Sequence, residues 1–194
     1  MSEEMAIEKL VENYVNFEGY FTTFRVPYKK SGGGLSDIDI IGYNPRNQET
    51  LLVEVKAWGS PESYKNAEKW DDWEEWIGEL KDGWKGFTRG GSNHWGFTKL
   101  DKVLIVLPAH FKTPNKEAIL SEELSKKFGF KVEILPIHSL IERLFFKVNE
   151  DMIVRRRRYP DTALELLRWI IRTSKNGDLN LGELEKKLKK TEGS

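Results

Sequence analysis

The sequence contains no cysteine and only three histidines, His94, His110 and His138, which lie far apart. Disulfides, thiolate zinc sites and cysteine nucleophiles are therefore excluded, and a metal bound here would be a hard ion held by oxygen atoms. No apolar run approaches the length of a membrane span, and the N-terminus, MSEEMAIEKL, is acidic. We therefore expect a cytoplasmic protein with no membrane partner. The sequence has no phosphate-binding loop or dinucleotide fingerprint, so we also expect no small-molecule cofactor.

Charge is balanced over the chain but unevenly distributed along it. The 194 residues carry 31 acids and 31 bases, so the protein is not uniformly basic. Residues 1–100 carry 12 Lys and Arg against 17 Asp and Glu, whereas residues 155–194 carry 11 bases against 6 acids. An acidic body with a basic C-terminal segment offers one region suited to metal ions and another suited to phosphates.

The hydrophobic pattern predicts an α/β fold with a mixed central sheet and helices on both faces. We assign residues 1–152 to this domain and residues 153–194 to a short basic helical appendage, similar to a partial helix-turn-helix, because an arginine run and Pro160 interrupt the pattern. The predicted helices cover 3–17, 62–84, 115–128, 138–148, 162–174 and 181–190, and the predicted strands cover 20–26, 35–43, 51–56, 103–107 and 130–135.

Charged residues lie on both strands of the predicted hairpin, with Asp39 on the first and Glu54 and Lys56 on the second. Alternate residues of a strand share a face, so Glu54 and Lys56 should point the same way, as should Asp37 and Asp39. Adjacent strands lie about 5 Å apart, so Asp39 and Glu54 approach each other if the register allows. Two such carboxylates suit Mg²⁺ or Mn²⁺, and a neighbouring lysine suits orienting a water or neutralising a phosphate. These residue types predict metal-assisted phosphodiester hydrolysis.

The same hairpin has a non-functional interpretation. Polar residues are ordinary on the exposed face of a hairpin, and a Glu-x-Lys triplet is common. The strand 51–55 is nevertheless apolar enough to be central, and a buried acid on such a strand needs a partner. Asp37 would replace Asp39 in the site if the register shifted by two residues.

The order of helix, strand, SDIDIIGYN and LLVEVKAW resembles the core of the PD-(D/E)XK nucleases, the restriction-endonuclease-like superfamily. Within this superfamily, the D-I-I-G…E-V-K form after an acidic helix is most similar to archaeal Holliday-junction resolvases and Mrr-like enzymes. The resemblance covers about residues 3–110. Ile38 stands where the superfamily's name has proline.

The resemblance implies a role for each of the hairpin residues. Asp39 and Glu54 match the metal ligands, with Mg²⁺ or Mn²⁺ as the cofactor, and Lys56 matches the catalytic lysine. A glutamate of the first helix often joins the metal site in this superfamily. Glu8 fits that position best, with Glu12 one turn later as the alternative.

Five of the seven tryptophans lie between residues 58 and 84, in or near one predicted helix. Packing of this helix against the sheet is the interpretation we favour. Base stacking and self-association are alternatives. The acidic residues among the tryptophans argue against DNA contact, which makes a homodimer interface the better of the two.

Basic residues gather in two segments that suit phosphate binding. The first is the loop KKSGGG ahead of Asp39, and the second is the arginine run that follows the predicted nuclease-like domain. Both segments have the alternative interpretation of a solvated connector. The candidate nucleic-acid-binding residues are Lys29, Lys30, Arg155, Arg156, Arg157 and Arg158.

The sequence therefore predicts a metal-dependent endonuclease that hydrolyses phosphodiester bonds of branched or duplex DNA. The alternative is a catalytically inactive nuclease-fold module that binds DNA or assembles with a partner. The preferred DNA structure, the oligomeric state and the biological pathway stay open.

Overall fold

The computed structural model describes residues 3–29, 33–56, 73–89, 96–107, 111, 113–155 and 164. The chain divides into two units, Met1–Leu140 and Ile141–Ser194. The division lies within helix α4 (Ile137–Arg155), and the predicted domain boundary at 152/153 also falls inside this helix. Of the helix predicted at 162–174 the structure describes only residue 164, which is helical, and the helix predicted at 181–190 lies outside the described residues.

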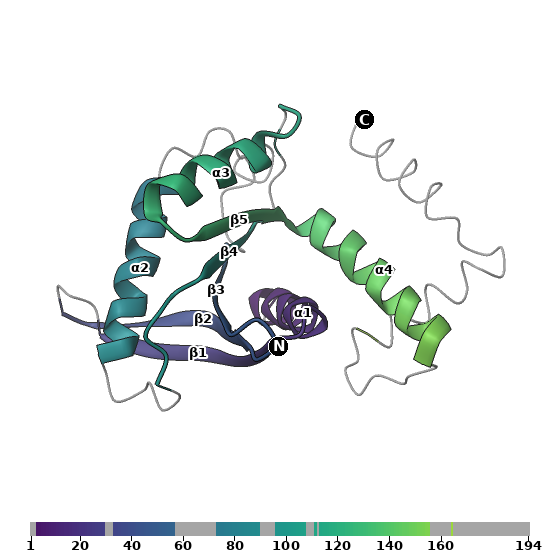
Figure 1. Cartoon of the computed structure of the whole chain (residues 1–194), viewed down its shortest axis with the longest axis horizontal. Coiled ribbons are helices and arrows are strands. Elements are labelled where there is room, and N and C mark those ends of the chain that lie inside the picture. Colours follow the sequence, from purple (N-terminus) through teal and green to yellow (C-terminus); the bar gives the residue numbers. More distant parts are fainter. Residues whose placement is uncertain are drawn as a thin grey trace. The chain divides into compact units, whose positions relative to one another are not determined.

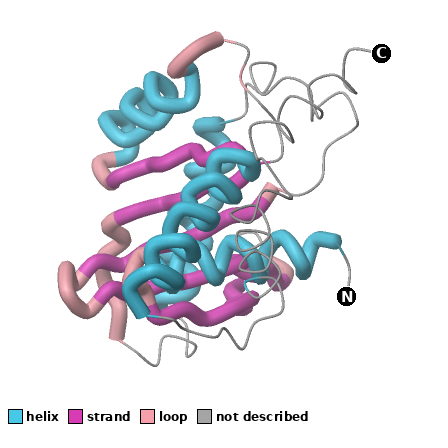
Figure 2. The backbone as a smooth tube through the Cα atoms, turned by 90° about the vertical axis from the view of Figure 1, so that its right-hand side faces the viewer, coloured by secondary structure: helices cyan, strands magenta, loops and turns pink. Residues whose placement is uncertain are grey.

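The first unit is built on a mixed five-stranded sheet with the strand order β1-β2-β3-β4-β5 (Figure 1). Strand β2 is antiparallel to both of its neighbours, β1 and β3, while β3, β4 and β5 run parallel. The parallel connections need crossovers, which α2 and α3 supply. Figure 2 shows the strands side by side. The strands are β1 (Phe21–Lys29), β2 (Leu35–Asn44), β3 (Glu49–Val55), β4 (Lys102–Leu107) and β5 (Lys131–Pro136).

Helices cover both faces of the sheet, which confirms the expected α/β class. Helix α1 (Glu3–Phe17) contacts β1, β2 and β3, and its buried residues include Val11 and Val15. Helices α2 (Trp73–Arg89) and α3 (Lys116–Phe128) pack on the opposite face (Figure 1).

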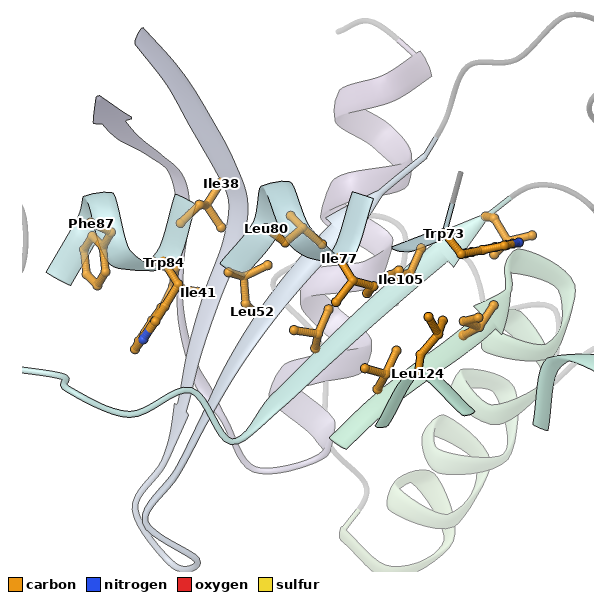
Figure 3. Close-up of a cluster of buried hydrophobic side chains, with 14 of the residues drawn as sticks. Ile38, Ile41, Leu52, Trp73, Ile77, Leu80, Trp84, Phe87, Ile105 and Leu124 are labelled. Carbon is orange, nitrogen blue, oxygen red and sulfur yellow. The ribbon is translucent and has the colours of Figure 1, made fainter. Parts of the chain in front are cut away.

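The core on the α2 face is continuous from one end of the helix to the other (Figure 3). Trp73, Ile77, Trp84 and Phe87 recur at helical spacing and point toward the sheet. Trp73 and Trp84 are each 5% exposed, and Trp76 is packed against the same cluster while only half-buried. Packing therefore accounts for these tryptophans, as we favoured. Trp58 and Trp70 lie outside the described residues.

The regular alternation of β2 breaks between Ile38 and Ile41. Ile38 and Ile41 both join the α2-face core although they are an odd number of residues apart. The pairs Phe24↔Ile40 and Val26↔Ile38 flank this position, so Arg25 of β1 lies opposite Asp39. Arg25 has a φ of 43°, in the left-handed region that L-residues rarely adopt. The change lies between Ile38 and Ile41, so the expectation that Asp37 and Asp39 share one face of the strand stays a prediction.

Three predicted element boundaries are wrong. The helix predicted at 138–148 continues as α4 to Arg155. The strand predicted to end at residue 26 continues as β1 through Pro27 to Lys29. This is possible because β1 is an edge strand, where the missing proline N–H costs no ladder hydrogen bond. The helix predicted to end at residue 84 continues as α2 to Arg89, because Phe87 extends its buried face.

Candidate metal and phosphodiester site

The open end of the β2–β3 pair brings Asp39 and Glu54 together. The ladder between these strands ends at the pair Ile40↔Val53, and the next residues in the same register are Asp39 and Glu54. Beyond that pair, Oδ2 of Asp39 accepts a hydrogen bond from the backbone N–H of Val55 at 2.7 Å. The Asp39 side chain thus forms the hydrogen bond to β3 that follows the last backbone pair of the ladder, and this bond fixes the position of its carboxylate. The structure places Asp39 beside Glu54 and leaves Asp37 exposed.

Lys56 lies at the end of β3 and is held from several sides. Its Nζ donates to Oε1 of Glu54 at 2.5 Å. The same Nζ lies 5.1 Å from the ring centroid of Trp76 in α2. Its backbone N–H donates to the carbonyl oxygen of Val106 in β4 at 2.8 Å. The predicted Glu54–Lys56 pairing on one side of β3 is therefore present.

Helix α1 contributes Glu8 to the same region. The Glu8 side chain is only 4% exposed, and its two carboxylate oxygens accept hydrogen bonds from Nε and Nη2 of Arg25 at 3.1 and 2.8 Å. Its charge reaches Asp39, whose pKa it raises. Glu12 instead accepts a hydrogen bond from Thr22 at 3.0 Å. Of the two glutamates considered, Glu8 is therefore the one that faces the candidate site.

Burial and crowding of negative charge perturb the carboxyl group of Asp39. Burial is the largest influence and the Glu54 carboxylate the next, and together they raise the pKa of Asp39 to about 7. The Val55 N–H opposes this shift because it stabilises the ionised form, while Glu8 and Asp37 add to it. A carboxylate surrounded by others in a partly buried place is the environment that a divalent cation would stabilise.

The protein's own cations already neutralise much of this negative charge. Arg25 binds Glu8 and Lys56 binds Glu54. Within the described ranges, no three Asp, Glu or His side chains lie close enough to one another to hold a metal ion. Asp39 and Glu54 still offer the oxygen donors that Mg²⁺ prefers, and Glu8 would have to leave Arg25 to join them.

Sequence reasoning missed two residues of this region, Arg25 and Trp76. Arg25 does carry a signal, because it is the sole charged residue between Tyr20 and Tyr28 in a strand of otherwise apolar and neutral polar residues. An isolated charge there suggests a specific partner. Trp76 carries no such signal, because its spacing is that of the tryptophans that pack the core.

The predicted nucleic-acid-binding residues are described only in part. Lys29 is exposed at the end of β1. Arg155 is the last residue of α4. Lys30, Arg156, Arg157 and Arg158 lie outside the described residues, so their role stays a prediction.

No family model matches the sequence, and no curated protein matches it. One solved structure, described as that of a "Protein of Unknown Function AF1548", is similar at 17% sequence identity. The match covers 86% of this chain and 76% of that chain, with a TM-score of 0.43. A likeness at this level assigns neither a fold family nor a function. Among the described helices, none is long and apolar enough to cross a membrane.

Proposed function

We propose that this chain has a restriction-endonuclease-like domain and is a metal-dependent endonuclease that hydrolyses DNA phosphodiester bonds. One observation carries the proposal. Glu8 of α1, Asp39 of β2, Glu54 of β3 and Lys56 directly after β3 converge on one end of the sheet, although they are spread over 8–56 in the sequence. The resemblance of the same residues to the nuclease motif supports the proposal.

Each of these residues has a part that follows from its chemistry. Asp39 and Glu54 would hold Mg²⁺ or Mn²⁺ through their oxygen atoms, and Glu8 would assist once separated from Arg25. When bound, such an ion supplies charge stabilisation at the phosphate and a water of lowered pKa. The Lys56 ammonium would orient the attacking water or neutralise charge that develops on the phosphate oxygens.

The donors fit a hard divalent cation on chemical grounds. All three acidic side chains offer oxygen. Burial first and the Glu54 carboxylate second raise the pKa of Asp39, and a bound cation would offset both by stabilising the ionised form. Lys29, exposed at the end of β1, would contribute to binding of the DNA backbone, together with the basic segment that begins at Arg155.

Cleavage assays on labelled duplex, single-stranded and four-way-junction DNA, with Mg²⁺, Mn²⁺ or EDTA, test the proposal. We expect cleavage that requires the metal and is abolished by Lys56→Ala, while DNA binding measured by gel shift is kept. Asp39→Asn should abolish cleavage as well. Asp37→Asn is the matched control, because Asp37 is an exposed acid two residues away and should be dispensable. Cleavage that survives Lys56→Ala would refute the assignment.

The second candidate is an inactive nuclease-fold module that binds DNA or a protein partner. The two ion pairs, Arg25–Glu8 and Lys56–Glu54, favour it because they neutralise the carboxylates without a metal. In that case DNA binding would occur without cleavage under every metal condition, and substitution of Glu54 or Lys56 would leave binding unchanged.

A further inference from the structure

The Lys56 side chain of the candidate site contacts the tryptophan-bearing helix α2. Its ammonium lies 2.5 Å from Glu54 and 5.1 Å from the centre of the Trp76 ring. The face of an indole attracts a cation at this distance. The head group of Lys56 is therefore placed between a carboxylate of the sheet and an aromatic ring of the helix, while its backbone is bound to β4 through Val106.

The ring of Trp76 is itself held by neighbouring aromatic rings. Trp76 meets Trp73 edge to face, with centroids 5.4 Å apart and an interplanar angle of 66°. Trp73 is 5% exposed and stacks on Phe111 at 6.2 Å. Such pairs favour one relative orientation of the rings. The cation-binding face of Trp76 is thus supported from the core.

We propose that Trp76 is a positioning residue that holds the Lys56 ammonium beside Glu54. The expected effect on cleavage rests on the proposed nuclease function, whereas the contact between Trp76 and Lys56 is a property of the fold. A lysine side chain has a flexible four-carbon stem and loses much rotamer entropy when it is held in one conformation. The Trp76 ring restrains this side chain and keeps its ammonium where it would contact a phosphate or the attacking water. Small displacements of a catalytic group reduce the reaction rate strongly.

Two substitutions separate the aromatic ring from the bulk of Trp76. Trp76→Phe keeps an aromatic face, whereas Trp76→Leu keeps an apolar side chain without one. Phe128→Leu is the matched control, because Phe128 forms a second contact of this kind with Lys81 of the same helix, at 5.9 Å. That pair does not include a residue of the candidate site.

The contact can be measured without any catalysis. The ε-methylene protons of Lys56 should be shifted upfield by the Trp76 ring in a ¹H–¹³C spectrum, with the signal assigned through Lys56→Arg. The shift should vanish in Trp76→Leu and persist in reduced form in Trp76→Phe. A Lys56 signal at the position of an exposed lysine in the unsubstituted protein would overturn the proposal.

The positioning role is measured by single-turnover cleavage with Mg²⁺. We expect Trp76→Leu to lower the cleavage rate constant by about 10- to 100-fold, with the Kd for DNA unchanged, and Trp76→Phe to restore most of the rate. Phe128→Leu should cut at the normal rate. If Trp76→Leu loses the upfield shift yet cuts at the normal rate, the positioning role is refuted while the nuclease function stands. If the unsubstituted protein cuts nothing, the nuclease function fails, and the Lys56 shift still decides whether Trp76 holds Lys56.

Discussion

The raised pKa of Asp39 predicts how the stability of the metal-free protein depends on pH. In the folded protein this pKa is about 7, against 3.8 for an ordinary aspartate. The folded state therefore binds the proton more tightly than the unfolded state does. The stability that this group contributes is complete below about pH 4 and is lost as the pH rises to about 7. Asp39→Asn removes the titration and keeps an oxygen that can accept from the N–H of Val55.

The expected magnitude follows from the size of the shift. One pKa unit corresponds to about 1.4 kcal/mol, so the full shift to about 7 from 3.8 costs the ionised protein up to about 4 kcal/mol. Between about pH 5 and about pH 8 the loss is about 2.5 kcal/mol. Urea unfolding in EDTA at these two pH values measures the free energy of unfolding. The unsubstituted protein should lose about 2.5 kcal/mol more than Asp39→Asn does, and the variant should be the more stable of the two at the higher pH.

One result of this unfolding experiment would contradict the raised pKa of Asp39. If the two proteins lose stability in parallel between these pH values, Asp39 does not titrate as the crowded carboxylates suggest. Adding Mg²⁺ at the higher pH provides a second arm. A metal held by the ionised Asp39 should raise the free energy of unfolding of the unsubstituted protein and leave that of Asp39→Asn unchanged.

Two further predictions concern the packing of α2 and the Arg25–Glu8 ion pair, and neither depends on the titration of Asp39. Gly86→Ala should destabilise by about 1 kcal/mol, because its Cβ would lie 3.0 Å from the Lys29 carbonyl oxygen, whereas Gly78→Ala, with nothing within 4 Å, should stabilise by about 0.5–1 kcal/mol. Urea unfolding measures both, and changes of the same sign would contradict the close approach of α2 to β1. Arg25→Met should cost about 2–3 kcal/mol because it leaves the buried Glu8 carboxylate unpaired, and adding Glu8→Gln should recover most of that loss. A double variant as unstable as Arg25→Met alone would show that the lost ion pair is not the cause.

Local pattern was enough to predict most of the elements. The periodicity of residues 3–17 predicted α1 at its observed bounds, and the apolar run 103–107 predicted the central strand β4, which spans Lys102–Leu107. The errors concern the ends of elements, which depend on contacts with distant parts of the chain. Pro27 is tolerated because β1 is at the edge of the sheet, and which strand lies at the edge cannot be read from local sequence.

In the candidate site, too, some features were predictable from local sequence and others depend on tertiary packing. The neighbourhood of Asp39 and Glu54 was predictable because the two residues lie on strands of one hairpin, where a short turn fixes the register. The choice between Glu8 and Glu12 was not, because it depends on how α1 is rotated against the sheet. The contact of Trp76 with Lys56 depends on where α2 crosses β3, and the spacing of the tryptophans predicts only that their helix packs.

The sequence by itself determined the residue types at the site, the hairpin that carries them and the alternation of strands with helices. These depend on short-range periodicity and on turns, which act over a few residues. Only the tertiary structure decided that Arg25 binds Glu8, that Asp39 lies where β2 changes its alternation, and that Lys56 lies against α2. These contacts join separate elements, and their geometry follows from how helices and strands pack around a shared core.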